Sequence, residues 1–357
     1  MLAGGGNTAY CEADNGKAPM YTVSILASPA RADLDDDTIS SLQSRWDGGR
    51  AIWLDRGTAA EFAIEARPTD FDEAWAQLDA QGFDLAVQPT AGRRKAVLLA
   101  DMDSTMIGQE CIDELADMAG VGQRVAAITA RAMNGELDFH EALVARVALL
   151  EGLPETVIAQ VLDSRITLAA GGPTLVATMK ANGAWTALVS GGFTDFTGPV
   201  ADRLGFDEQR ANVLLSDERG RLSGRVALPI LGREAKVEAL HEITAARGLT
   251  PADAIAVGDG ANDLGMLQLA GTGVALHAKP VVAAQAPVRI NHGDLTALLY
   301  LQGYGRDEFV ALDPRTREVR HAFRLARGAH TEIIGPARSG RPDTCRAVPP
   351  AAPVPAG

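Results

Sequence analysis

Two carboxylates stand two residues apart directly after an apolar run. The run LLA at 98–100 is followed by Asp101, Met102 and Asp103. Carboxylates this close repel each other unless a bound cation offsets their charge. If their surroundings separate the two pKa values, one aspartate can attack an electrophile while the other transfers protons. The pair predicts nucleophilic catalysis, although Asp103 or Ser104 alone could serve as an ordinary helix cap.

Three further polar groups follow along the chain. They are Ser190-Gly191-Gly192 after WTALV, Lys236 in GREAK, and GDGAND at 258–263 after AIAV. Taken singly, each has a structural explanation, because glycine-rich segments form turns and a lysine is commonly solvated. All of them fall where predicted strands end or where the facing helices begin. Together they predict one site at one edge of a sheet.

The residue types of this site suit phosphoryl transfer. Asp101, Asp103 and Asp259 offer hard oxygen ligands of the kind that Mg²⁺ prefers, and the cation would let the carboxylates cluster. Backbone N–H groups of the glycine-rich turns, the Ser190 hydroxyl and the Lys236 ammonium would hold a phosphoryl group. We therefore predict Mg²⁺-dependent transfer through an aspartyl-phosphate.

The pattern of the chain from 91 to 304 predicts an α/β domain that can position these residues. Strands are expected at AVLLA, WTALVS, NVLLS, AIAVGD and TGVAL, with helices such as GREAKVEALHEITAARG between them. This alternation is typical of a doubly wound, mainly parallel sheet. The turn-rich segment 216–224 predicts a hairpin. The helical stretch at about 107–172, between the first two polar groups, predicts a cap that closes over the site.

Residues 20–90 predict a separate small α+β domain. Their order is strand, helix, strand, strand, helix, strand, which is the ferredoxin-like arrangement. We interpret it as a structural or dimerisation module, which leaves a homodimer open, and an amino-acid-sensing domain of the ACT kind is the alternative. Residues 1–19 are Gly-rich, and 305–357 hold seven of the 18 prolines. We expect these two segments to be disordered or largely so.

Composition excludes several classes of protein. The net charge of −13 argues against binding to nucleic acid, since phosphate backbones attract basic patches. No apolar run approaches the ~20 residues that a membrane span needs, and the first residues lack the pattern of a secretory signal. The three cysteines form no CxxC pair, which argues against a disulfide framework or a cysteine zinc site and favours the cytoplasm.

The four polar groups resemble the motifs of the haloacid dehalogenase-like superfamily, in the order of that superfamily, over residues 95–303. The resemblance implies a Rossmann-like sheet with a helical cap. It implies that Asp101 is the nucleophile and Asp103 the general acid and base. It also implies a metal site made by the Asp101 carboxylate, the Asp103 backbone carbonyl and Asp259. The expected phosphate-binding and supporting residues are Ser190, Gly191, Lys236, Asn262 and Asp263.

Within that superfamily the chain resembles the phosphoserine phosphatase family. The resemblance lies in DMDSTMIGQECIDELA, MNGELDFHEALVARVALLEGLP, VSGGF, GREAK and VGDGANDLGML. It implies that Glu110 pairs with the substrate ammonium and Arg146 with its carboxylate, while Met133 and Phe139 form apolar walls. The implied reaction is hydrolysis of a small phosphomonoester, O-phospho-L-serine, as the last step of serine biosynthesis. A phosphotransferase that uses another amino-acid hydroxyl and a non-catalytic serine-sensing protein are the alternatives.

Overall fold

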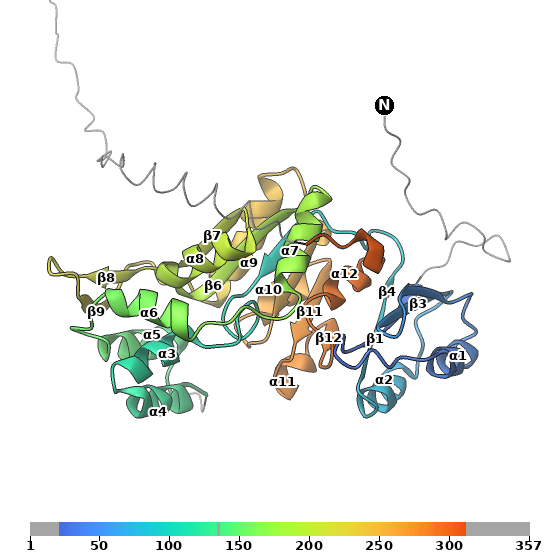
Figure 1. Ribbon diagram of the computed structural model, residues 1–357, viewed down its shortest axis with the longest axis horizontal. Helices are drawn as coiled ribbons and strands as arrows, with labels where there is room; N and C mark the ends of the chain where they lie inside the picture. The colour runs from blue at the N-terminus through green and yellow to red at the C-terminus, as the bar shows by residue number, and fades with distance from the viewer. Residues whose placement is uncertain (1–20, 134–135, 312–357) are drawn as a thin grey trace, which may run out of the picture.

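The computed structural model describes residues 21–133 and 136–311, which form three parts in a row (Figure 1). The first domain lies at one end, the large sheet in the middle and the helical cap at the other end. The predicted tail 1–19 and residues 312–357 lie outside the described part. None of the helices in the described ranges is long and apolar enough to cross a membrane.

The first domain is a four-stranded antiparallel sheet with two helices on one face. Its elements are β1 (Tyr21–Ala27), α1 (Asp36–Arg45), β2 (Ile52–Asp55), β3 (Ala59–Ile64), α2 (Phe71–Asp79) and β4 (Phe83–Pro89). The strand order is β2-β3-β1-β4. Val23 and Ile25 of β1 pack with Ile39 of α1 and Leu78 of α2, because alternate strand residues face the helices. The predicted ferredoxin-like, ACT-like arrangement is confirmed.

The other face of this sheet is buried against the large domain. Leu26 and Ala86 belong to the same apolar core as Leu298 of helix α12 (Ala297–Leu301). Polar contacts also cross the boundary, among them the hydroxyl of Tyr300, which donates to Asp55 over 2.7 Å. The sheet face that an isolated domain would leave open is therefore covered within the chain itself.

The large domain contains a parallel six-stranded sheet, which confirms the predicted doubly wound fold. In spatial order the strands are β12 (Val288–Ile290), β11 (Thr272–Leu276), β10 (Ala254–Gly258), β5 (Val97–Ala100), β6 (Trp185–Phe193) and β7 (Glu208–Asn212). Leu98 and Ala100 point to one face of the sheet and Leu99 to the other. Both faces are apolar because helices cover both.

Helices from different parts of the chain cover the two faces. The first face carries α7 (Gly172–Ala181), α8 (Thr194–Leu204) and α12, and the second carries α9 (Arg233–Ala245) and α10 (Leu264–Leu269). A short helix, α11 (Pro280–Ala283), follows β11. The four polar motifs lie at the ends of β5, β6 and β10 and in the first turn of α9.

Three sequence predictions need correction in detail. The segment NVLLS is not one sheet strand: β7 ends at Asn212, and Leu214–Ser216 is β8 of the predicted hairpin, paired with β9 (Leu222–Val226). The edge strand β12 was not predicted. The C-terminal tail does not begin at 305, because the Val310 N–H donates to the Thr178 hydroxyl over 2.9 Å. Residues 305–311 thus pack on the large domain.

The cap consists of α3 (Cys111–Met118), α4 (Gly122–Met133), α5 (Phe139–Ala148) and α6 (Thr156–Ser164). Its two connections to the sheet run side by side, since Ile107 and Leu168 form an antiparallel bridge. The hairpin joins the cap through Leu222, whose N–H donates to the Leu153 carbonyl over 2.8 Å. The cap is therefore a compact insertion whose two connections to the sheet, here called the hinge, lie side by side.

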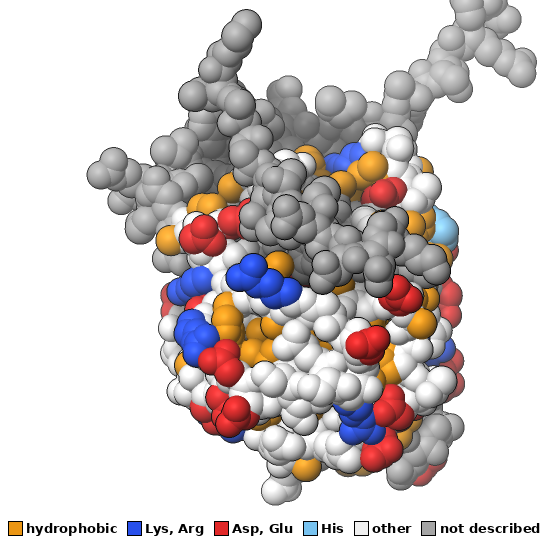
Figure 2. All heavy atoms as spheres, turned by 90° about the vertical axis from the view of Figure 1, so that its right-hand side faces the viewer, with side chains coloured by type: hydrophobic (Ala, Val, Ile, Leu, Met, Phe, Trp, Pro, Cys, Tyr) orange, Lys and Arg blue, Asp and Glu red, His pale blue; other side chains and the backbone are white. Residues whose placement is uncertain are grey.

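Charged side chains of both signs are interspersed on the face seen from the first-domain end, around scattered apolar groups (Figure 2). The ion pairs of the first domain include Arg31–Asp33, Arg56–Asp36 and Arg45–Asp70, each at 2.6 Å. Exposed pairs of this kind contribute about 0–1 kcal/mol each to stability. The stability of the first domain depends instead on the apolar residues that its sheet buries on both faces.

Candidate active site

A buried lysine lies between two buried aspartates at the carboxyl edge of the sheet. Asp101 directly follows β5, and Lys236 reaches it from the first turns of α9. The Lys236 Nζ lies 2.7 Å from Asp101 Oδ1 and 2.6 Å from Asp263 Oδ1. All three side chains are at most 7% exposed. Burial would lower the pKa of Lys236, but the charges of the two carboxylates offset this and raise it.

Asp101 has the environment of a carboxylate that needs positive charge nearby. Burial, and then the charge of Asp263, raise its pKa well above the usual range, while Lys236 opposes the shift. Its backbone N–H donates to the Val257 carbonyl over 3.0 Å, which fixes the turn after β5. The carboxylate is held in place without being exposed to bulk water.

Asp103 lies in a different environment, under the start of the cap. Its Oδ1 accepts a hydrogen bond of 3.1 Å from the backbone N–H of Cys111, the first residue of α3. Burial, followed by the charge of Glu110, raises the pKa of Asp103 to about 7. A carboxyl group with this pKa can donate and accept a proton near neutral pH. The two aspartates of the motif are thus chemically distinct.

Three carboxylates gather where a cation would fit. Oxygen atoms of Asp101, Asp259 and Asp263 all lie within 4.8 Å of one another. Burial, and then the Asp263 charge, raise the pKa of Asp259 to about 6, and the Thr105 hydroxyl donates to its Oδ1 over 3.1 Å. A set of hard oxygen donors with unfavourably crowded charge suits Mg²⁺. Asp263, expected only as a supporting residue, therefore belongs to the cluster.

The end of β6, where the pairing with β7 is irregular between Val189 and Phe193, brings polar groups to the same place. The Ser190 hydroxyl accepts a hydrogen bond of 2.9 Å from the Gly192 N–H. A Cβ at Gly192 would lie 2.8 Å from Asp103 Oδ2, so only glycine permits this close approach. Ser190 itself is 2% exposed. The end of β6 brings Ser190, Gly191 and Asp103 together around one small volume.

Two charged cap residues interact with the surroundings of Asp103. Glu110 stands at the start of α3, and its Oε1 accepts a hydrogen bond of 2.8 Å from the Ser104 hydroxyl. Arg146 lies on α5, and its Nε donates to the Ala142 carbonyl over 3.2 Å. Burial lowers the pKa of Arg146, while the charges of Asp113, Glu110 and Asp103 raise it. The cap thus carries one acidic and one basic group toward the aspartates.

An aromatic side chain of the cap touches the sheet domain directly. A Cβ at Gly191 would lie 3.1 Å from Phe139 Cζ, and one at Gly232 would lie 3.4 Å from Phe139 Cδ1. The ring therefore sits against two glycines on two different loops. Asn262, in the loop after β10, is half-buried beside Gly260. The predicted wall residue Met133 ends α4, and its side chain lies outside the described part.

Comparison with known proteins identifies the family. A model of haloacid dehalogenase-like hydrolases matches residues 98–268. Over 206 residues the chain is 50% identical to a phosphoserine phosphatase of Albidiferax ferrireducens, covering 56% of this chain and 86% of the relative. The chain belongs to the phosphoserine phosphatase family.

Two further members of the family extend the comparison beyond the catalytic region. A phosphoserine phosphatase of Streptomyces coelicolor is 43% identical over 260 residues, 72% of this chain, so the match spans 63% of that relative's length. A solved structure of a probable phosphoserine phosphatase from Vibrio cholerae superimposes with a TM-score of 0.66 at 30% identity, over 81% of this chain and 88% of that one. That alignment is longer than the large domain alone, so it includes part of the first domain.

Sequence reasoning missed one residue that organises the site of this phosphatase family member. Asn212 is 2% exposed, and its Nδ2 donates to the Gly191 carbonyl over 2.8 Å. Its Oδ1 accepts from the Leu231 N–H over 2.7 Å. Asn212 thereby ties the end of β6 to the loop before α9, the two segments that contact Phe139. No signal pointed to it, because the sequence predicted a continuous strand through NVLLS.

Thr105 belongs to the segment DMDST at 101–105, but the sequence indicated no role for it. Its hydroxyl contact with Asp259 joins the loop after β5 to the loop after β10. The signal was its position, because a hydroxyl residue two places after Asp103 lies on the same turn. The two motif loops are therefore linked before any ligand binds.

Proposed function

We propose that this protein hydrolyses O-phospho-L-serine to L-serine and phosphate, with Mg²⁺ as cofactor, and so completes L-serine biosynthesis. The observation that carries the proposal is the position of Glu110 and Arg146. Glu110 stands at the start of the cap and accepts a hydrogen bond of 2.8 Å from Ser104, the neighbour of Asp103, and the charges of Asp113, Glu110 and Asp103 all act on Arg146 of α5. A substrate there would meet an acidic group for its ammonium and a guanidinium for its carboxylate. The family relationship supports the same substrate.

The nucleophile in this proposal is Asp101. Its carboxylate forms a bond to phosphorus while the bond from phosphorus to the serine oxygen breaks, which leaves an aspartyl-phosphate and an alkoxide. Asp103 donates its proton to that alkoxide, as its pKa of about 7 permits. Asp103 then takes a proton from water, whose oxygen attacks phosphorus and releases Asp101 and inorganic phosphate.

Other residues hold the transferred group during both steps. Lys236 and the Ser190 hydroxyl lie where they can contact its oxygens, and the N–H groups of the glycine-rich turn add further donors. Asp101, Asp259 and the Asp103 carbonyl would hold the metal, and Asp263 stands within reach of the same ion. When bound, Mg²⁺ would neutralise the clustered charge and polarise the phosphoryl oxygens. Phe139 would help the cap to exclude water.

A reducing compartment such as the cytoplasm is part of the proposal. The three cysteines lie far apart in the sequence, and Cys111, the described one, is a buried free thiol. Burial raises the pKa of that thiol, so it is a poor nucleophile. It serves as packing at the start of α3.

The decisive experiment combines a substrate panel with intermediate trapping. Phosphate release from phosphoserine, phosphoethanolamine, phosphoglycolate and p-nitrophenyl phosphate should be fastest with phosphoserine and should require added Mg²⁺. Acid-quenched enzyme should carry the phosphoryl label on Asp101, and Asp101→Asn should carry none. Asp163→Asn is the matched control, because this cap carboxylate is 77% exposed and should be silent.

The same assay with acceptor alcohols tests transfer instead of hydrolysis. Phosphorylated homoserine as the main product would replace the hydrolase by a phosphotransferase. Label on a serine or histidine would refute the nucleophile, and equal rates on all four esters would refute the substrate.

A further inference from the structure

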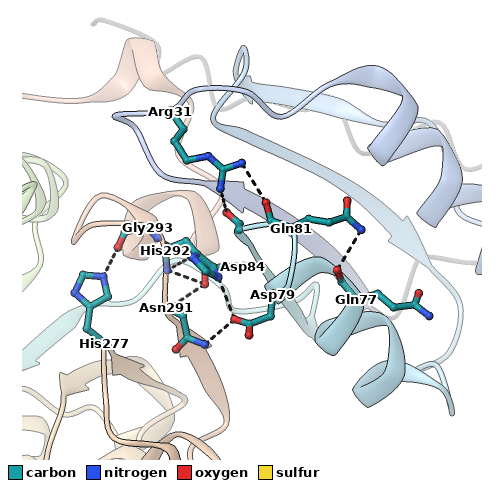
Figure 3. Close-up of polar contacts among 10 residues, drawn as sticks. Arg31, Gln77, Asp79, Gln81, Asp84, His277, Asn291, His292 and Gly293 are labelled. Carbon is teal, nitrogen blue, oxygen red and sulfur yellow. Dashed lines mark hydrogen bonds and ion pairs between the residues drawn. The ribbon is translucent and has the colours of Figure 1, made fainter.

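One buried carboxylate of the first domain binds the backbone of the large domain. Asp84 on β4 is 1% exposed and faces the loop that follows β12 (Figure 3). Its Oδ1 accepts from the Asn291 N–H over 2.6 Å, and its Oδ2 accepts from the Gly293 N–H over 2.7 Å. The His292 N–H between them lies 3.2 Å from both oxygens. Three successive backbone donors thus converge on one carboxylate, which fixes the loop in one conformation.

Side chains fix the same loop from both domains. Asp79, at the end of α2, accepts from Asn291 Nδ2 over 2.8 Å and lies 3.0 Å from His292 Nε2. On the other side, His277 Nε2 lies 2.7 Å from the Gly293 carbonyl (Figure 3). The loop is therefore held between the first domain and the end of β11.

The loop continues directly to the end of the cap insertion. The Leu295 N–H donates to the Ala170 carbonyl over 3.2 Å, and Leu295 is fully buried. Gly171 has a φ of 77°, and a Cβ there would lie only 2.6 Å from the Thr296 nitrogen. Only glycine fits such a contact, so the loop and the chain leaving the cap are packed backbone against backbone.

That chain is one strand of the cap hinge. The Ala169 N–H donates to the Met106 carbonyl over 2.9 Å, and the Gly108 N–H donates to the Thr167 carbonyl over 3.0 Å. The incoming connection at 106–108 starts one residue after Thr105 of the catalytic motif. Asp84 is thereby connected to the hinge through one short, fully packed path.

We propose that Asp84 is a positioning residue for the cap: by holding residues 291–293 it sets the position of the hinge and couples the first domain to closure of the lid. The path is contiguous packed backbone, which has few alternative arrangements. The kinetic part of this inference rests on the proposed function, whereas its structural part does not.

Asp84→Asn tests the proposal in the full chain. The amide has one acceptor oxygen, and its NH₂ group would face backbone donors, so at least one of the short bonds is lost. Amide hydrogen exchange should become faster at 291–293 and also at the hinge amides of Gly108, Ala169 and Leu295. kcat/KM for phosphoserine should fall by between about twofold and thirtyfold, the range typical of changes along coupled elements. The rate on p-nitrophenyl phosphate should change less, because that ester lacks the groups that the cap reads.

Asp55→Ala is the matched control. It removes the 2.7 Å hydrogen bond to Tyr300 across the same domain boundary but does not touch 291–296. It should leave unchanged both the exchange rates of the hinge amides and the ratio of kcat/KM for phosphoserine to that for p-nitrophenyl phosphate. If Asp84→Asn does not fold, Asp79→Ala replaces it, because that side chain is 33% exposed and should give the same changes at smaller size.

Faster exchange at 291–293 with an unchanged hinge would overturn the proposal, as would an equal loss on both substrates. If the wild-type protein did not hydrolyse phosphoserine, the exchange data alone would still decide whether Asp84 controls the hinge. The two failures are thus distinguishable.

Discussion

Replacing Arg146 by alanine tests how the cap selects its substrate. Its guanidinium is half-buried and lies in the field of Asp113, Glu110 and Asp103. Truncating one partner of a buried charge pair costs about 2–5 kcal/mol. Because Arg146 keeps some contact with water, we expect the lower part of that range, about 2–3 kcal/mol. This corresponds to a loss of roughly 30- to 150-fold in kcat/KM for phosphoserine.

The assay compares phosphoserine with substrates that lack one of its groups. Phosphoethanolamine and p-nitrophenyl phosphate have no carboxylate, so Arg146→Ala should change their kcat/KM by less than about threefold, an effect below ~0.7 kcal/mol. Arg165→Ala is the matched control, because this cap arginine pairs with Glu114 at 2.9 Å and is 37% exposed. It should leave kcat/KM unchanged for phosphoserine, phosphoethanolamine and p-nitrophenyl phosphate. An equal loss on every substrate would show that Arg146 maintains the cap instead of reading the carboxylate, and the reasoning would be refuted.

Three other predictions concern the chemistry and its support. The pKa of Asp103 is raised to about 7 and its acid form protonates the leaving group, so kcat/KM for phosphoserine should fall as the pH rises through that value. Glu110→Gln removes a charge that raises this pKa, so the fall in kcat/KM should move to lower pH. Hydrolysis of p-nitrophenyl phosphate should not show this fall. Asn212→Ala leaves buried polar backbone groups of two segments without their hydrogen-bond partner, at a cost of about 1–3 kcal/mol each. Calorimetry should therefore show a lower Tm, and product inhibition should show a weaker affinity for phosphate. Lys236→Ala should lower the Tm in the presence of a chelator, because Asp101 and Asp263 lose the positive charge that pairs with them. Added Mg²⁺ should restore part of this loss. A Tm that does not depend on Mg²⁺ would argue against the metal site.

The sequence allowed the fold to be predicted where periodicity was strong. The predicted order of elements in 20–90 is the observed one, and the run before Asp101 is a buried strand with helices on both faces. Period-two alternation and continuous apolar runs report directly which faces are buried. The positions of the motif residues at strand ends followed from the same pattern, since all parallel strands end at one edge.

Features that depend on contacts between distant segments were not predictable in the same way. Asn212 ends a strand whose sequence reads onward into the hairpin, and only tertiary packing decides where the pairing changes partner. In the sequence, Asp84 is an ordinary polar residue of an alternating strand. Nothing near it indicates that it binds a loop 207 residues away. Glu308 similarly forms a 2.7 Å ion pair with Arg94. Local composition made 305–311 resemble the rest of the tail.

The bridge between Ile107 and Leu168 gives the cap the topology of a loop whose two ends touch. A segment of this kind can be lengthened, shortened or exchanged during evolution without changing the order of the strands beneath it. The aspartates proposed to carry the chemistry stand outside the loop, whereas Glu110 and Arg146 stand within it. Under the proposed function, bond-breaking and substrate choice are encoded in separable pieces of chain, so selection could redirect the enzyme to a new ester while the reaction is inherited intact.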